Sequence, residues 1–172
     1  ALLSGFGNIA AVALRASDRL EVGSNVLLGS AGNRPQQLVL DTPLLTTAAG
    51  ETVFHAGELG LRNSSAAHAT APVAGTGTLS VQADRVRFAG GDVALDGFAA
   101  TTLNAAQGMT TGRDTRLRSG GDLSLSAAFL GGAAGTAGTE LVITAPGRSL
   151  SLTRPATPSG STVGVQVPPV SG

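Results

Sequence analysis

Apolar and polar residues alternate with a period of two along most of the chain. The alternation is clearest in Leu79-Ser80-Val81, Val86-Arg87-Phe88 and Val93-Ala94-Leu95. This period is typical of strands, whose successive side chains point to opposite faces, and the Gly, Asn, Asp and Ser residues between the runs supply turn geometry. The stretch AAVALRASDRL (residues 10–20) could form an amphipathic helix, but the residues that follow it alternate instead. The pattern predicts an all-β chain.

The apolar runs follow one another at short intervals. Leu79, Val86 and Val93 are seven residues apart, and Leu141 and Leu150 are nine apart. Strands of about three to five residues at this spacing favour a β-solenoid, because the strands of a β-sandwich are longer and its core usually contains aromatic anchors. Two or three strands per coil give about twenty residues per coil, so that residues 12–153 make about six or seven coils.

In such a coil, small aliphatic side chains stack in columns, and the core can do without many aromatic residues. Aromatic residues make up 3% of this chain and are all Phe. We expect the alternate residues of the clearest strands to point inward: Val81, Phe88, Val93, Leu95, Leu103, Leu123, Leu125, Ile143 and Leu152. Their neighbours on the same strands are expected to point outward: Gln82, Arg87, Ser124 and Ser151.

A glycine-glycine-aspartate turn occurs twice, in FAGGDVAL (residues 88–95) and RSGGDLSL (residues 118–125). We predict that both are equivalent corners, where glycine permits positive φ and the Asp side chain bonds the backbone. A longer repeat, in which Asp-Arg is followed by an alternating strand, a small turn and a second strand, begins at Asp18 and at Asp84, with a looser version at Asp114. Calcium-binding β-rolls use a similar motif in tandem, but with a third glycine that is missing here, so a structural turn is favoured.

Three stretches interrupt the alternation. Residues 63–78 and 131–139 are small, polar and glycine-rich, and both are predicted to be loops that protrude from the stack. Residues 155–172 carry four of the eight prolines. We therefore divide the chain into a β-helix segment, residues 1–154, and a Pro-rich tail or linker, residues 155–172. The first residue is not Met and no polar capping helix is evident, so the chain is expected to be a segment of a longer protein.

Composition excludes several classes of site. Net charge is zero, which gives no basis for binding nucleic acid or an anionic membrane. Cysteine is absent, so disulfides, thiolate chemistry and cysteine-based metal sites are excluded. No apolar run approaches the ~20 residues that cross a bilayer, and the first residues lack the positive charge of a signal peptide.

Three runs resemble a known family: GTGTLSVQADRVRFAGGDVALDGFAATTLNAAQG, RLRSGGDLSLSAAFL and TELVITAPGRSLSLT. They are similar to the shaft repeats of filamentous haemagglutinin-like exoproteins, the large two-partner secretion proteins of Gram-negative bacteria. The resemblance is strongest over residues 75–153. It implies a right-handed parallel β-helix, export through an outer-membrane transporter, and a secreted or cell-surface location. The asparagine-containing motifs of the family's secretion domain are not evident, which favours the shaft.

The resemblance and the composition together predict a structural shaft segment of an adhesin or exoprotein. We expect no catalysis, no cofactor and no metal ligand, and no partner beyond the transporter and a host-cell surface or glycan. The alternative is a polysaccharide-binding or polysaccharide-cleaving module on the same scaffold. A compact β-sandwich is a second rival.

The candidate chemical residues are few. His55 and His68 are the only histidines, and neither lies in a catalytic-triad or zinc pattern. Five acids could act as acid and base, or bind calcium, if adjacent coils gathered them on one face: Asp84, Asp92, Asp96, Asp114 and Asp122. Five arginines could bind a sulfated glycan, although solvated outer positions are favoured: Arg85, Arg87, Arg113, Arg116 and Arg118. Asn63-Ser64-Ser65 matches a glycosylation acceptor, which we treat as coincidence.

Overall fold

A computed structural model describes residues 2–3, 9–132 and 139–155. This part of the chain contains strands and no helix, and so it has no helix that could cross a membrane. The strands are β1 (Leu2–Leu3), β2 (Ala11–Arg15), β3 (Leu20–Val22), β4 (Val26–Leu28), β5 (Gln37–Asp41), β6 (Leu44–Thr47), β7 (Glu51–Arg62), β8 (Gly77–Phe88), β9 (Gly91–Asp96), β10 (Phe98–Thr111), β11 (Thr115–Ser119), β12 (Asp122–Ala127), β13 (Leu130–Gly132), β14 (Thr139–Ile143) and β15 (Leu150–Thr153).

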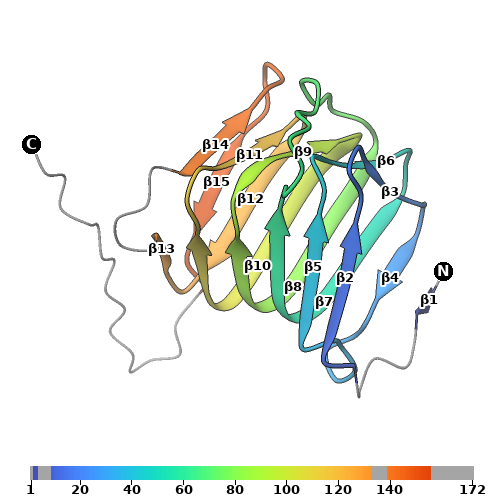
Figure 1. Cartoon of the computed structure of the whole chain (residues 1–172), viewed down its shortest axis with the longest axis vertical. Helices are drawn as coiled ribbons and strands as arrows, with labels where there is room; N and C mark the ends of the chain where they lie inside the picture. The colour runs from blue at the N-terminus through green and yellow to red at the C-terminus, as the bar shows by residue number, and fades with distance from the viewer. Residues whose placement is uncertain (1, 4–8, 133–138, 156–172) are drawn as a thin grey trace, which may run out of the picture.

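The strands stack in parallel as a β-solenoid of about 6 turns (Figure 1). A large sheet has the order β1-β4-β7-β8-β10-β12-β15, with β2, β5 and β13 beside this path, and a small sheet has the order β14-β11-β9-β6-β3. Each complete coil runs along the large sheet and returns through the small one. The prediction of an all-β solenoid is confirmed, and the β-sandwich is excluded. The split at residue 154 stays a prediction, because residues 156–172 lie outside the described part.

The offset between neighbouring coils is a little longer than predicted and is not constant. In the large sheet Ala100 lies beside Asp122, 22 positions later, whereas Phe54 lies beside Val81, 27 positions later. In the small sheet Thr115 lies between Gly91 and Thr139, 24 positions away on either side. Turns of different length absorb most of the difference, and the register between β8 and β10 also shifts, between Phe98 and Ala100 and between Ala105 and Gly108.

Three strands are much longer than the sequence pattern predicts. β7 and β8 have 12 residues each and β10 has 14. In β8, Leu79-Ser80-Val81 and Val86-Arg87-Phe88 belong to one strand, not to two. Ala83 and Val86 are both buried, and the two residues between them, Asp84 and Arg85, are not. The inward pattern therefore slips by one position at a corner within one continuous strand, where the register with β10 also shifts between Ala105 and Gly108. In the sequence this slip resembles a strand end.

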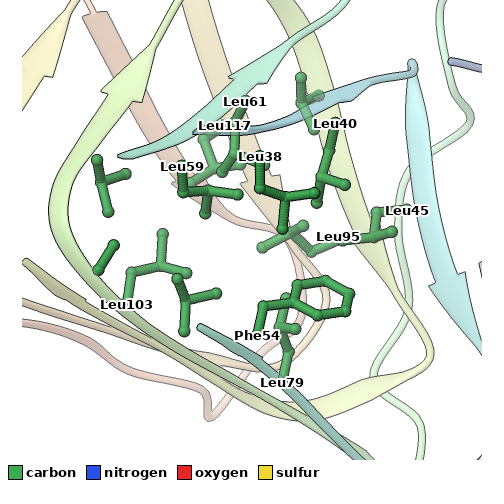
Figure 2. Packing of buried hydrophobic residues seen from close by; sticks show 14 of the residues in the cluster. Leu38, Leu40, Leu45, Phe54, Leu59, Leu61, Leu79, Leu95, Leu103 and Leu117 are labelled. Atoms are coloured by element: carbon green, nitrogen blue, oxygen red, sulfur yellow. The ribbon is translucent and has the colours of Figure 1, made fainter. Parts of the chain in front are cut away.

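The core consists of columns of side chains, one from each coil (Figure 2). One column contains Phe54, Val81, Leu103, Leu125 and Leu152 in register. Its first four members are at most 2% exposed, but Leu152 is 57% exposed. Leu152 continues the inner column as predicted, but it is not buried, because it lies on β15, the last strand of the large sheet. Seven other predicted inward residues are confirmed as buried: Val81, Phe88, Val93, Leu95, Leu103, Leu123 and Leu125. Ile143 is partly buried and packs against the same core.

Two threonines of a second column are expected to weaken the core. Thr52, Leu79, Thr101 and Leu123 stack in register, and the hydroxyls of Thr52 and Thr101 are buried without a hydrogen-bond partner. A valine has nearly the same shape without the unpaired hydroxyl. We expect Thr52→Val and Thr101→Val each to raise the free energy of unfolding by about 1 kcal/mol in urea titrations.

Thr47 is the matched control for these variants. It is also buried, but its hydroxyl donates a hydrogen bond to the Ala49 carbonyl at 3.3 Å. Thr47→Val is expected to lower stability. Equal losses from all three substitutions would contradict the assignment of unpaired hydroxyls.

Candidate functional site

Residues 63–76 leave the coil stack and return to it at the start of β8. Because the coil of β7 contributes no strand to the small sheet, β6 pairs directly with β9, and Leu45 lies beside Leu95, 50 positions later. Residues 63–76 run over the outer face of the small sheet instead, and we call them the crossing segment. The predicted departure from the stack is confirmed. The segment does not protrude freely, because it binds this face.

The Arg118 guanidinium group holds the crossing segment at its centre. Its Nε donates to Asp92 Oδ1 at 2.8 Å, and its two Nη atoms donate to the main-chain carbonyls of Ala69 and Thr70 at 2.8 and 3.2 Å. The side chains of Arg118 and Asp92 are 13% and 16% exposed. Asp96 Oδ1 accepts a hydrogen bond from the Val73 N–H at 2.8 Å, and Thr144 Oγ1 donates to the Pro72 carbonyl at 2.7 Å.

The five predicted acids do not form one site. Four of them bind separate structural partners: Asp84 binds Arg34, Asp92 binds Arg118, Asp96 binds Thr46 and Val73, and Asp122 binds Arg148 and Ser149. Asp114 is in a turn with φ 50°. The hydrogen bonds that Ser149 donates to Asp122 lower the pKa of that carboxyl. In the described residues, no group of three His, Cys, Asp or Glu side chains could hold a metal ion.

The prediction that Asp92 and Asp122 occupy equivalent corners is wrong. Asp92 lies on β9 of the small sheet beside Arg116, whereas Asp122 lies on β12 of the large sheet beside Ala100. The two motifs are thirty positions apart, whereas neighbouring coils are offset by 24 positions at Asp92 in the small sheet and by 22 at Asp122 in the large sheet. The repeated motif marks two different corners of the solenoid.

The two glycine pairs also differ in conformation, because only the first pair has positive φ. Gly90 and Gly91 have φ of 110° and 80°, as predicted for a turn. Gly120 and Gly121 are needed because other main chain passes close by. A Cβ on Gly121 would lie 2.2 Å from the Phe98 carbonyl oxygen, and one on Gly120 would lie 2.2 Å from the carbonyl carbon of the crossing-segment residue Val73.

The histidines and the predicted glycosylation site have no active-site geometry. His55 lies on β7 beside Gln82 of the large sheet, whereas the exposed His68 lies 4.0 Å from Asp92 of the small sheet. The Asn63 side-chain amide donates to the carbonyls of Ala67 and Asp92 at 2.8 and 3.1 Å. Asn63 therefore anchors the start of the crossing segment.

Asp41 is the most buried charged residue of the described chain, and the sequence pattern did not predict its polar cluster. Arg15, Asp41 and Arg62 lie in register at the ends of β2, β5 and β7. Both arginine Nε atoms donate to Asp41 Oδ2, at 3.0 and 2.9 Å, and the Ser64 N–H and hydroxyl donate to the two carboxylate oxygens at 2.9 and 2.8 Å. Each of the three charged residues is the last residue of an alternating strand, and the three positions are about one coil apart in the sequence. This regular spacing is the signal that could have predicted the cluster.

The Asp41 carboxylate is strongly stabilised in its charged form. Burial by itself raises the pKa of Asp41, but the hydrogen bonds from Ser64, Arg15 and Arg62 outweigh it and bring the pKa to about 2. A carboxylate that is fully hydrogen-bonded and ionised at neutral pH is a poor proton donor. The cluster fixes the start of the crossing segment to the ends of three strands.

An open groove of about 300 Å³ follows the corner of the large sheet. We call it the corner groove, and its polar lining comes from Gln36, Gln37, Glu58, Asp84, Arg85 and Gln107. Arg34 reaches Asp84 from beside the groove and donates to both carboxylate oxygens at 2.9 and 3.0 Å. Gln37 donates to Glu58 at 3.2 Å.

The predicted arginine group is divided by the fold. Arg116 pairs with Glu140, and Arg118 pairs with Asp92. Arg85 lies in the corner groove, and Arg85, Arg87 and Arg113 form no ion pair with any described residue. The five arginines therefore do not make one basic surface.

No family model matches the chain, and the searches of curated proteins and of solved structures found no similar protein. The resemblance to filamentous haemagglutinin-like proteins stays a prediction from the sequence motifs.

Proposed function

We propose that the chain is a structural shaft segment of a secreted or surface-displayed bacterial exoprotein. The observation that carries this proposal is the repetition of the same contacts from coil to coil. A core column and a parallel ladder continue in register through β7, β8, β10, β12 and β15. Each further coil therefore lengthens the protein by about 4.8 Å without a new kind of contact.

The polar clusters support the same role. Asp41, Asp92 and Asp96 each bind the crossing segment or the strand ends beside it. These charged groups hold the coils and the crossing segment together. The sequence resemblance adds the expected context, which is export through an outer-membrane transporter and contact with a host-cell surface or glycan.

A one-coil deletion tests the shaft role. Removal of residues 101–122 joins Ala100 to Leu123, which then takes the position of Thr101 beside Leu79. We expect the shortened chain to fold with its remaining ladders in register. Since the chain has no Cys, single cysteines can replace the exposed Glu21 on β3 and Glu140 on β14. These sites are offset by four residues along the strands, so nitroxide labels there should come closer by about 4 Å in pulsed electron paramagnetic resonance.

The matched control is the deletion of residues 101–111, which removes most of β10 and keeps β11. It takes out only part of a coil, so the following strands fall out of register and the chain should unfold. Loss of folding in the one-coil variant, or a label distance unchanged from the full chain, would show that the segment is not an additive spacer.

A further inference from the structure

The corner groove presents one polar side chain from each of four successive coils. Gln37, Glu58 and Arg85 are in register on β5, β7 and β8, and Gln107 precedes Gly108, the partner of Arg85 on β10. The side chains of Gln36, Arg85 and Gln107 have no hydrogen bond to another described residue. The groove therefore runs along the solenoid axis, and three of its four coils contribute a side chain with unused hydrogen-bonding groups.

An exposed aromatic ring adjoins the groove on the next coil. Phe129 is 44% exposed, and it is the only exposed aromatic residue of the described chain. The Met109 N–H donates to the Phe129 carbonyl at 2.9 Å, which fixes Phe129 beside β10. A Cβ on Gly108 would lie 2.3 Å from the ring, so the glycine allows the ring to lie against the backbone immediately after Gln107.

The chemistry of this surface favours hydroxyl groups. The amide side chains of Gln36, Gln37 and Gln107 both donate and accept hydrogen bonds, as sugar hydroxyls do. Two positive and two negative side chains at the groove balance one another: Arg34, Arg85, Glu58 and Asp84. The ring of Phe129 offers a flat apolar surface for the C–H face of a pyranose.

An extended peptide fits this surface less well. The neighbouring coil already occupies the backbone at the corner, because the Glu58 N–H donates to the Gln36 carbonyl at 2.8 Å and the Gly57 N–H donates to the Pro35 carbonyl at 2.9 Å. No free strand edge is available there for an added strand. Recognition has to rest on side chains, and these are spaced one coil apart.

We infer that the corner groove, together with Phe129, binds a neutral linear polysaccharide laid along the solenoid axis. The side chains of Gln36, Arg85 and Gln107 bind its hydroxyls, and Phe129 stacks on one of its rings. This binding role goes beyond the proposed shaft function and does not depend on it, since a shaft without a glycan site would still pass the one-coil deletion test.

Titration of the isotope-labelled full chain with cellohexaose, chitohexaose, maltohexaose and mannohexaose tests this inference by NMR. At least one of these probes should shift amide signals of the corner residues of β5, β7, β8 and β10, with a Kd of about 1 mM for an open, weakly enclosed site. Phe129→Ala should weaken binding about tenfold, and Arg85→Ala about threefold, because each removes a single contact.

Arg87→Ala is the matched control, because Arg87 is exposed on the same strand, two positions beyond Arg85, and outside the groove. It should leave the affinity unchanged. Gln107→Ala is the second variant, to be used if Phe129→Ala does not fold, because it removes an exposed side chain. It should weaken binding about threefold. The inference is overturned if no probe shifts the corner signals, or if Arg87→Ala weakens binding as much as Arg85→Ala. Tighter binding of a heparin hexasaccharide that high salt abolishes would also overturn it, in favour of a charged ligand.

Discussion

Replacement of Leu103 by arginine is expected to unfold the chain. Leu103 is 0% exposed and stacks between Val81 and Leu125, so the guanidinium would enter the middle of an apolar column. A buried unpaired charge together with the lost apolar contacts costs well over about 4 kcal/mol, against a total stability of about 5–15 kcal/mol for a domain. Circular dichroism and urea titration measure the loss.

The neighbouring residue provides the control. Asn104 lies beside Gln82 and Ser126 on the outward face of the same strand. Asn104→Arg is expected to change the free energy of unfolding by less than about 1 kcal/mol. If Leu103→Arg melted at the wild-type temperature, the assignment of inner and outer faces would be wrong.

The second large effect is expected at Asp41. Asp41→Asn removes the carboxylate that two arginines and Ser64 share, and its side chain is only 4% exposed. The variant leaves Arg15 and Arg62 without their common anion, so we expect a loss of about 3 kcal/mol in the free energy of unfolding. Arg15→Gln is the matched control, because Arg15 is largely exposed, and it should cost less than about 1 kcal/mol.

The Asp41 carboxylate is expected to make the free energy of unfolding depend on pH. Its pKa is about 2 in the folded chain, below the ordinary value of 3.8, so the folded state binds the proton more weakly than the unfolded state. The stabilisation is complete above about pH 5 and is lost as pH falls through the folded pKa. We expect the wild type to lose about 2 kcal/mol more than Asp41→Asn between pH 5 and pH 2. Parallel losses in the two proteins would contradict this role of Asp41.

The candidate sites are formed by residues from adjacent coils, so the local sequence pattern alone could not predict them. Arg116 and Arg118 lie on the same face of β11, because alternate residues of one strand must do so. Their partners, Glu140 and Asp92, come from the adjacent coils, and the crossing segment covers Arg118 from outside. The corner groove likewise combines four coils, so that no single stretch of sequence contains its pattern.

The sequence by itself determined the all-β solenoid and most of its inner positions. Alternation is a local property of a strand, and residues such as Val81, Leu103 and Leu125 are inward whichever coil lies next to them. Only the tertiary structure decided which coils are neighbours, because the offset between coils depends on turns and on the crossing segment. Leu45 lies beside Leu95 although 50 positions separate them, and Asp92 and Asp122 lie in different sheets although their motifs match.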